Sequence, residues 1–346
     1  MTSKTGLLIL NVGTPEAPTV PAVKRYLKEF LSDPRIISLP KSLRLLFVHG
    51  FILPFRTRNS THAYQAIWNS ETGSPLMSHS VNFQKALQSV LGENYQVVLG
   101  MRYGKPSIQE AIEQFKQQGV HQIILAPLYP QYASASTGSA LESVFDHLKS
   151  WIVMPSVQIL EPFYDSSYYI QANANLIVPY LDQPWDSLLL SFHGLPFSQV
   201  KATETHTPLS CEKDLPCPKI EAHNQHCYRA QCYRTAHLLG QALQIREDQY
   251  QVCFQSRVGM NRWIGPDLES VLKRLIGEDK KNLLVACPSF VADCLETLEE
   301  IGIRAKQTWQ KLGGASFTLI PCLNDDPNWV TGFSKILQTN NLAPAP

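Results

Sequence analysis

The chain has 346 residues, of which 44% are hydrophobic and 17% are charged, and its formal net charge is +1. This near-neutral balance argues against a nucleic-acid-binding surface, which normally shows a basic excess. Its apolar runs are broken well short of the roughly 20 residues that a membrane span needs, and the N-terminus lacks the pattern of a secretory signal. We therefore expect a cytoplasmic protein that is long enough for two domains.

Eight short apolar runs rich in Val, Ile and Leu are predicted to be strands. Because they are continuous and bounded by Gly or Pro, they are typical of strands buried on both faces. In chain order they are GLLILNVG, YQVVLGMRYG, QIILAPLYPQ, VQILEPF, SLLLSFHG, YQVCFQSR, NLLVACPSF and FTLIPCL. Between them lie helical patterns such as SIQEAIEQFKQQG, ALESVFDHLKSW, DLESVLKRLIG and DCLETLEEIGIRAKQTWQKLGG. The alternation predicts an α/β fold with parallel sheets and right-handed crossovers.

The strands fall into two sets of four with similar spacing, each with a long gap after its first strand. This pattern indicates an internal duplication. We predict two Rossmann-like lobes, each a four-stranded parallel sheet flanked by helices. The expected boundaries are 1–164 for the N-terminal lobe and 165–346 for the C-terminal lobe.

The long gap of the first lobe contains PFRTRNSTHAYQAIW, which we expect to form a lip. Its polar side chains are either solvated surface or contacts for an anion; they are Arg56, Arg58, His62 and Tyr64. The apolar run LRLLFVHGFILPF precedes and overlaps this segment. It is either a buried helix or a place of peripheral membrane contact.

Hydroxyl groups gather where the third strand gives way to a helix, in PLYPQYASASTGSA (127–140). Hydroxyls and free N–H groups at a helix N-terminus form an anion site, whereas an ordinary serine cap would explain only one of them. The second strand ends in MRYGKPSI, which adds cationic and aromatic groups. Such a crevice suits a flat, apolar ligand with carboxylate tails. The residues that we expect here are Arg102, Tyr103, Lys105, Tyr129, Tyr132, Ser134, Ser136 and Thr137.

A histidine and two carboxylates follow strands of the second lobe. SLLLSFHGLP places His193 at the carboxyl end of one strand, and NLLVACPSF leads into VADCLETLEEI, which carries Asp293 and Glu296. Ligands of open α/β sheets bind beyond the carboxyl ends of the strands, so these groups could meet in one cleft. A lone histidine in a strand is more often a satisfied core residue. Its pairing with a carboxylate instead favours acid–base work on a bound metal or a nitrogen ligand.

The ordered motifs resemble those of ferrochelatase, the class II chelatase family that inserts ferrous iron into a porphyrin. They are NVGTP, MRYGKPSI, PLYPQYASASTGS, SFHGLP, CFQSRVG…W…P and ADCLETLEE, and they extend from Leu7 to about Trp329. The resemblance implies two Rossmann-like lobes with a porphyrin cleft between them. One departure is Cys294, where several members of the family carry histidine.

The resemblance also implies roles for individual residues. His193 matches the essential histidine of the family and Glu296 its cleft glutamate, so both are expected catalytic and metal-side groups. The remaining matches are Asp293 and Glu300 as acidic neighbours, Trp263 with 255–257 as cleft wall, and Arg102 with Tyr103 as the pair after the second strand.

The physical case agrees with these roles. Metal insertion removes two pyrrole protons; an imidazole titrating at about 6.5 can take a proton at neutral pH, and a carboxylate oxygen suits Fe²⁺. We therefore expect an enzyme that inserts Fe²⁺, as substrate, into protoporphyrin IX to form protohaem. Arg56, Arg58 and the 134–137 turn are expected contacts for the propionates. The alternatives are a chelatase for coproporphyrin or another tetrapyrrole, and a haem carrier in which His193 is only an axial ligand.

Four of the eight cysteines crowd into one segment: Cys211, Cys217, Cys227 and Cys232. Some ferrochelatases bind a [2Fe–2S] cluster through four cysteines, and four thiolates in a short loop are what such a cluster needs. Zinc would accept the same ligands. Alternatively, CYRAQCYRTAHLLG simply begins an amphipathic helix.

Overall fold

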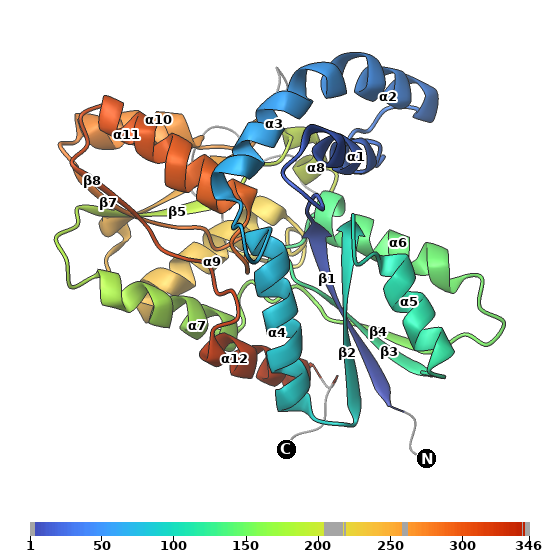
Figure 1. Ribbon diagram of the computed structural model, residues 1–346. Helices are drawn as coiled ribbons and strands as arrows, with labels where there is room; N and C mark the ends of the chain where they lie inside the picture. The colour runs from blue at the N-terminus through green and yellow to red at the C-terminus, as the bar shows by residue number, and fades with distance from the viewer. Residues whose placement is uncertain (1–3, 204–216, 218, 258–261, 341, 343–346) are drawn as a thin grey trace. The chain divides into compact units, whose positions relative to one another are not determined.

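The computed structural model describes residues 4–203, 217, 219–257, 262–340 and 342. All eight predicted strands are present, and they form two parallel sheets (Figure 1). The first sheet has the order β2-β1-β3-β4 and the second has the order β6-β5-β7-β8. The strands are β1 (Thr5–Gly13), β2 (Tyr95–Tyr103), β3 (Gln122–Pro127), β4 (Ser156–Ile159), β5 (Ser187–His193), β6 (Tyr250–Gln255), β7 (Asn282–Ala286) and β8 (Ser316–Leu319).

Each sheet belongs to its own compact unit. The first unit comprises Met1–Tyr129, Ala133–Glu161 and Asp325–Pro346, and the second comprises Pro130–Tyr132 and Pro162–Asn324. The chain thus switches units close to the expected boundary of 164, but its last 22 residues lie with the first unit rather than the second.

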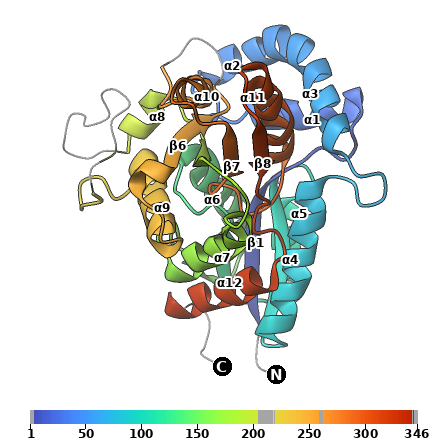
Figure 2. The ribbon, with the colours of Figure 1, turned by 90° about the vertical axis from the view of Figure 1, so that its left-hand side faces the viewer.

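Helices flank both sheets, as the sequence pattern predicts (Figures 1 and 2). Those of the first unit are α1 (Val20–Leu31), α2 (Lys41–Phe47), the π-helix η1 (Val48–Ile52), α3 (Leu53–Ile67), α4 (Pro75–Leu91), α5 (Ile108–Gln117), the π-helix η2 (Ser134–Gly138), α6 (Ser139–Leu148) and α12 (Pro327–Thr339). Those of the second unit are α7 (Ser167–Ile177), η3 (Val178–Tyr180), α8 (Phe197–Lys201), α9 (Tyr228–Ala242), η4 (Glu247–Gln249), α10 (Leu268–Gly277), the π-helix η5 (Glu296–Ala305) and α11 (Lys306–Lys311). None of the helices in these described ranges is long and apolar enough to cross a bilayer.

The two units repeat one local design. In the first, β2 is followed by a backbone hydrogen bond from Met101 N–H to Pro106 O, and Ser107 caps α5. In the second, Phe254 N–H donates to Pro266 O in the same way, and Asp267 caps α10. With the shared strand order, this repeat agrees with the internal duplication that the strand spacing predicts.

Aromatic stacking explains why the C-terminal segment joins the first unit. Both views show α12 beside α4, although about 240 residues separate them in sequence (Figures 1 and 2). The rings of Trp329 and Phe333 lie 5.9 and 5.4 Å from the ring of Phe83 on α4. Burial of these large apolar side chains supplies the driving force for the docking of α12.

Central strands are buried on both faces, but the edge strands differ. Residues 7–10 of β1 and 188–190 of β5 are fully buried. The prediction of two buried faces is wrong for β4, where Ile159 is 39% exposed, because only one side of this edge strand is paired. The other edge strand of this sheet, β2, has some of its free backbone groups bonded by side chains of α4. Gln88 Oε1 accepts from Val97 N–H at 2.8 Å, and Gln84 Nε2 donates to Val97 O at 2.9 Å.

Two segments depart from the sequence-based expectation of ordinary helix. The run LRLLFVHGFILPF forms α2, η1 and the start of α3, and it is not a buried helix, because most of its large apolar side chains are exposed. The segment after β7 contains the π-helix η5 in place of a continuous α-helix. A π-helix closes i→i+5 hydrogen bonds, a spacing that a 3.6-residue pattern does not reveal.

A glycine at the end of β1 provides a test of the first sheet. Gly13 has φ of +102°, and a Cβ there would lie 1.8 Å from Tyr103 O. Because backbone cannot move away from this clash and the φ itself is strained, we expect Gly13→Ala to lower the free energy of unfolding by more than about 2 kcal/mol. The measurement is urea unfolding followed by circular dichroism.

Gly50→Ala is the matched control, since a Cβ at Gly50 would meet nothing within 4 Å. It should leave stability unchanged or raise it by up to about 1 kcal/mol, the helix-propensity difference between the two residues. Equal stability of the two variants would contradict the proposed clash.

Candidate active site

His193 is the last residue of β5, the strand that lies between β6 and β7 in the second sheet. The strand before it is fully buried, whereas His193 is partly exposed. The next residue, Gly194, approaches its neighbours closely: a Cβ there would lie 2.6 Å from Gln255 O and 3.4 Å from the ring of Trp263. The histidine therefore emerges at the carboxyl edge of the sheet, beside the predicted wall residue Trp263.

Three hydrogen bonds hold His193. Its N–H donates to Ser289 Oγ at 3.0 Å, and its carbonyl oxygen accepts from Tyr228 Oη at 2.8 Å. Its ring Nδ1 lies 2.6 Å from Gly194 O. Because a carbonyl oxygen can only accept, Nδ1 carries the proton in the neutral ring. The neutral imidazole thus keeps its lone pair on Nε2, which can accept a proton or bind a metal ion.

Glu296 begins the π-helix η5, and Glu300 lies one turn further on. The carboxylate of Glu300 accepts from Ser256 N at 2.7 Å and from Ser256 Oγ at 2.6 Å. The carbonyl oxygen of Glu296 accepts from Gln255 Nε2 at 2.7 Å. These three bonds connect η5 to the end of β6 and the residue after it, beside His193.

Asp293 has a different position from its acidic neighbours. It is buried and accepts from Thr297 Oγ1 at 3.0 Å and from Asn324 Nδ2 at 2.8 Å, so it ties the start of this segment to the chain after β8. The adjacent Cys294 is also buried. Burial and the nearby Glu296 carboxylate raise the pKa of the Cys294 thiol.

The predicted Arg-Tyr pair of the first unit belongs to an internal network around Asp33. Arg102 Nη2 donates to Asp33 Oδ2 at 2.6 Å, Tyr103 Oη donates at 2.8 Å, and Ser139 Oγ donates at 2.5 Å. Tyr103 is only 1% exposed, and burial raises its pKa, so its hydroxyl remains a donor. Burial alone would raise the pKa of Asp33, but the bonds from Ser139, Arg35 N–H and Tyr103, together with the Arg102 charge, hold it below its usual value.

The hydroxyl-rich turn lies in the π-helix η2, next to this network. Ser134 Oγ accepts from Arg35 Nη1 at 2.7 Å. Thr137 is buried, and its Oγ1 has no hydrogen-bond partner among the described residues. Tyr129, at the end of the preceding strand, is half-buried, and burial raises its pKa.

The lip residues of α3 divide by burial. Arg56, Arg58 and His62 are exposed, whereas Tyr64 is buried and packs its ring against Tyr26. The structure thus gathers Arg102, Tyr103 and Ser139 around one carboxylate, with the hydroxyl-rich turn beside them, and leaves Arg56 in solvent.

Sequence reasoning missed Asp33, Tyr228 and Ser289. Asp33 follows α1 in an unremarkable Asp-Pro turn, and nothing in that pattern indicates a buried carboxylate. Tyr228 stands between the cysteines of CYRAQC, and Ser289 in the CPSF that ends a strand motif. Their contact with the backbone of His193 depends on tertiary structure, which local patterns do not encode.

For the cysteine segment the sequence leaves a [2Fe–2S] cluster, a zinc site and a plain amphipathic helix open, and Cys211 lies outside the described residues. Cys217 Sγ accepts from Arg229 Nη1 at 2.9 Å, and Cys227 precedes α9. Cys232 is fully buried, and burial raises its pKa. Within the described ranges, no three His, Cys, Asp or Glu side chains are grouped to hold a metal ion.

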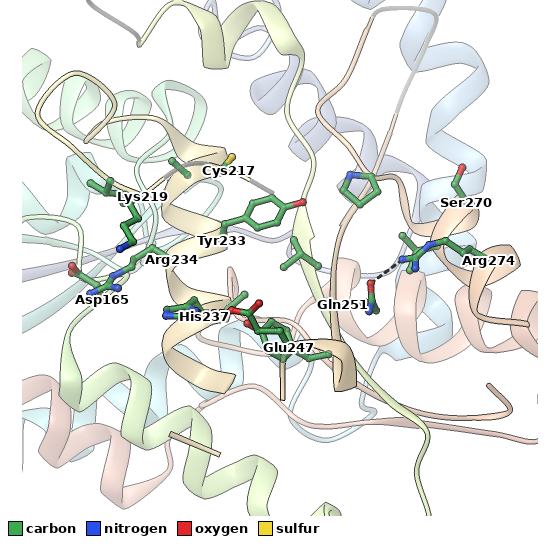
Figure 3. A pocket seen from close by; sticks show the side chains of 17 residues that line it. Asp165, Cys217, Lys219, Tyr233, Arg234, His237, Glu247, Gln251, Ser270 and Arg274 are labelled. Atoms are coloured by element: carbon green, nitrogen blue, oxygen red, sulfur yellow. Dashed lines mark hydrogen bonds and ion pairs between the residues drawn. The ribbon is translucent and has the colours of Figure 1, made fainter. Parts of the chain in front are cut away.

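A hollow of about 1000 Å³ opens in the second unit between α9, β6 and α10 (Figure 3). Its polar side chains carry both signs of charge, with Lys219, Arg234 and Arg274 against Asp165 and Glu247. Neither His193 nor Glu296 lines it. The hollow is therefore separate from the candidate active site, which is defined by hydrogen bonding at the sheet edge.

Two four-stranded parallel sheets flanked by helices, with His193 at a carboxyl edge, define an α/β architecture that solved structures share. The chain is similar to SirB from Bacillus subtilis with Fe³⁺, with a TM-score of 0.56 and 12% identity over 99% of this chain and 96% of that chain. It is also similar to the sirohydrochlorin chelatase SirB from the same species in complex with cobalt, with a TM-score of 0.54 and 11% identity over 97% and 94% of the two chains. The fold is that of the class II chelatases.

The sequence comparisons identify the family. The sequence model of the ferrochelatase family matches residues 4–341. A ferrochelatase of Legionella pneumophila is 48% identical over 96% of this chain and 98% of its own, and one of Coxiella burnetii is 43% identical over 96% and 93%. The chain belongs to the ferrochelatase family.

The network around Asp33 provides a pH-dependent test. Because its folded pKa lies below that of the unfolded chain, Asp33 stabilises the protein above about pH 4, and this contribution is lost as pH falls through the folded value. We expect Asp33→Asn to lower the free energy of unfolding by about 2–4 kcal/mol at pH 7. The difference from wild type should shrink below pH 4 in urea titrations.

Asp146→Asn is the control, because Asp146 is exposed on α6 and pairs with Lys149 at the surface. It should unfold like wild type at pH 7. If the difference in the free energy of unfolding between Asp33→Asn and wild type stays constant down to pH 3, the charge of Asp33 is not the source of its stabilisation.

Proposed function

We propose that His193 and Glu296 carry out, in this chain, the insertion of Fe²⁺ into protoporphyrin IX, the terminal step of haem synthesis. The chain is an enzyme of the ferrochelatase family, with a metal ion and a tetrapyrrole as substrates. The observation that supports the assignment best is the bond between His193 Nδ1 and Gly194 O, since it leaves Nε2 as the acceptor of the neutral ring.

The reaction exchanges Fe²⁺ for two pyrrole protons, so the protein must accept protons and present a metal ion partly stripped of water. Nε2 of His193, the nitrogen of the neutral ring that carries no proton, can accept a pyrrole proton. Carboxylate oxygens suit Fe²⁺, and Glu296 is a partly exposed carboxylate at the start of η5. Glu300, oriented by two hydrogen bonds from Ser256, extends the acidic surface along the same helix.

The substrate contacts divide into direct and indirect ones. Arg56 is an exposed cation and Thr137 offers a hydroxyl without a described partner, which suits both to a propionate. Trp263 supplies a flat aromatic wall beside Gly194. Ser134 and Tyr129 flank the same turn as Thr137, whereas Arg102 and Tyr103 act through Asp33 by holding that part of the first unit in shape.

The proposed role of His193 is tested by replacement. We expect His193→Ala to lower kcat for iron insertion by at least about 100-fold, the lower end of the range for general acid–base catalysis. Protoporphyrin affinity should change less than threefold, because the imidazole acts on the protons rather than on the ring. The measurement is anaerobic iron insertion by absorbance, with porphyrin binding by fluorescence quenching.

His121→Ala is the control, since His121 is exposed at the start of β3. Near-normal turnover of His193→Ala would end the assignment. Assays with protoporphyrin IX and coproporphyrin in parallel should show the higher kcat/KM for protoporphyrin. A chain that binds haem without inserting iron would instead be a carrier.

The [2Fe–2S] cluster on Cys211, Cys217, Cys227 and Cys232 stays a prediction from the sequence, and no step above uses it. Protein purified anaerobically with a cluster should be red-brown and contain acid-labile sulfide. Colourless, sulfide-free protein would remove the prediction. We propose a cytoplasmic setting, which suits the buried, reduced thiols described in the second unit; these are Cys227, Cys232, Cys253, Cys287, Cys294 and Cys322.

We further propose that the apolar run 43–55, which leads into the lip, makes peripheral contact with a membrane. Its exposed apolar side chains are Leu43, Leu45, Leu46, Phe47, Phe51 and Phe55, and Phe55 is 76% exposed. Cationic side chains at Lys41, Arg56 and Arg58 flank them. An amphipathic helical segment with an apolar face and basic neighbours is the pattern of an interfacial helix, and the porphyrin substrate is itself lipophilic.

If this contact exists, replacing its exposed phenylalanines should weaken binding to lipid vesicles. The double variant Phe51→Ser/Phe55→Ser should bind vesicles of phosphatidylglycerol and phosphatidylcholine at least tenfold more weakly in sedimentation assays. The reason is that burying one Phe contributes about 1.5–3 kcal/mol. Ile152→Ser is the control, because Ile152 is fully exposed in the loop before β4 but lies outside this run. An equal loss in both proteins would point to nonspecific adsorption.

A further inference from the structure

One buried amide joins the strand of His193 to the helix of Glu296. Gln255, the last residue of β6, is 2% exposed and pairs with His193 in the sheet register. Its carbonyl oxygen accepts from Gly194 N–H at 2.8 Å. Its side chain extends to η5, where Nε2 lies 2.7 Å from Glu296 O and 3.5 Å from Glu300 Oε2.

The carbonyl oxygen of Glu296 can only accept, so it fixes the orientation of this amide, and a third contact completes its hydrogen bonding. Ser191 Oγ, two residues before His193 on β5, donates to Gln255 Oε1 at 2.7 Å. An amide oxygen only accepts and an amide nitrogen only donates. With Oε1 facing the serine, Nε2 must face the two acceptors of η5. The backbone and side chain of one residue therefore hold both catalytic elements.

We propose that Gln255 is a positioning residue for iron insertion, which sets the place of Glu296 relative to His193. The proposal rests on the roles assigned to those two residues above. Proton transfer and metal delivery depend on geometry, and a misplacement of about 1 Å can cost on the order of 100-fold in rate. A buried amide with its hydrogen bonds satisfied resists such movement, because breaking them leaves polar groups unpaired.

The chemistry of the side chain restricts what can replace it. Leucine has a similar volume but neither donor nor acceptor. An ionised glutamate would place an acceptor against Glu296 O and a second negative charge beside Glu300. A protonated glutamate, by contrast, has one O–H donor and one acceptor oxygen, and it could reproduce both contacts of the amide.

The experiment uses the full chain with Gln255→Leu and Gln255→Glu. We expect Gln255→Leu to lower kcat 10- to 100-fold, with protoporphyrin affinity within threefold of wild type. The activity of Gln255→Glu relative to wild type should recover at least fivefold as pH falls from 8 to 5.5, since protonation restores the donor. A purely structural role would not produce this recovery.

Gln231→Leu is the matched control. Gln231 is 1% exposed in the same unit and makes its own side-chain hydrogen bonds to Tyr132 N–H and Gln225 O, away from β6. Gln231→Leu should lose about as much thermal stability as Gln255→Leu, but its kcat should stay within threefold of wild type. Equal kcat losses in the two leucine variants would overturn the proposal, as would a flat relative pH profile of Gln255→Glu.

A double variant separates the proposal from the function on which it rests. If Gln255 acts through Glu296, Gln255→Leu should lower kcat less than twofold in a Glu296→Gln background, because coupled residues are not additive. If the two substitutions lower kcat by the product of their separate effects, the positioning role of Gln255 is overturned, while the proposed function stands. Failure of the function itself would appear differently, as undiminished iron insertion by His193→Ala.

Discussion

The hydrogen bond between the ring of His193 and the carbonyl oxygen of Gly194 determines the chemistry available to the second unit. Carbonyl oxygens carry no proton, so the acceptor position of the neutral ring is assigned by the backbone rather than by another ionisable side chain. Gly194 also lies tight against Gln255 O, where a Cβ would come within 2.6 Å of that oxygen, so the position favours a residue without Cβ. Ser289 and Tyr228 then fix the backbone on either side of the imidazole.

Because the two units share one architecture, aligned positions can be compared to show which residues are particular to the second unit. The matching bonds after β2 and β6 align Gly13 with Gly194, and they align Arg102 with Gln255. In the first unit the position before the glycine is Val12, an ordinary strand residue, whereas in the second it is His193. At the aligned positions on the neighbouring strands, Arg102 connects to Asp33 and Gln255 connects to η5. One scaffold therefore carries two different hydrogen-bond networks, one around Asp33 and the other between β6 and η5.

Much of this arrangement could be predicted from the sequence because its signals are local. The eight strands are apolar runs with sharp ends, and the location of His193 and Glu296 follows from the rule that parallel strands present their carboxyl ends on one edge. The π-helix could not be predicted, since its side-chain spacing overlaps with that of an α-helix over a single turn. Asp33 and the docking of α12 on α4 depend on partners far apart in the sequence. The Arg102–Tyr103 pair was predicted as substrate contacts, but local sequence could not show that a buried carboxylate engages both.

The glutamines of α4 have a consequence for how the first sheet behaves toward other molecules. By occupying the donor and the acceptor of Val97, Gln84 and Gln88 leave no hydrogen-bonding template at that point for an incoming extended chain. Gln88 also donates to Tyr95 O at 3.0 Å, so the protection extends along the strand. Unprotected strand edges are where soluble proteins begin to aggregate. Two neutral side chains from a neighbouring helix thus end the sheet at β2 and guard this part of its edge against intermolecular strand addition.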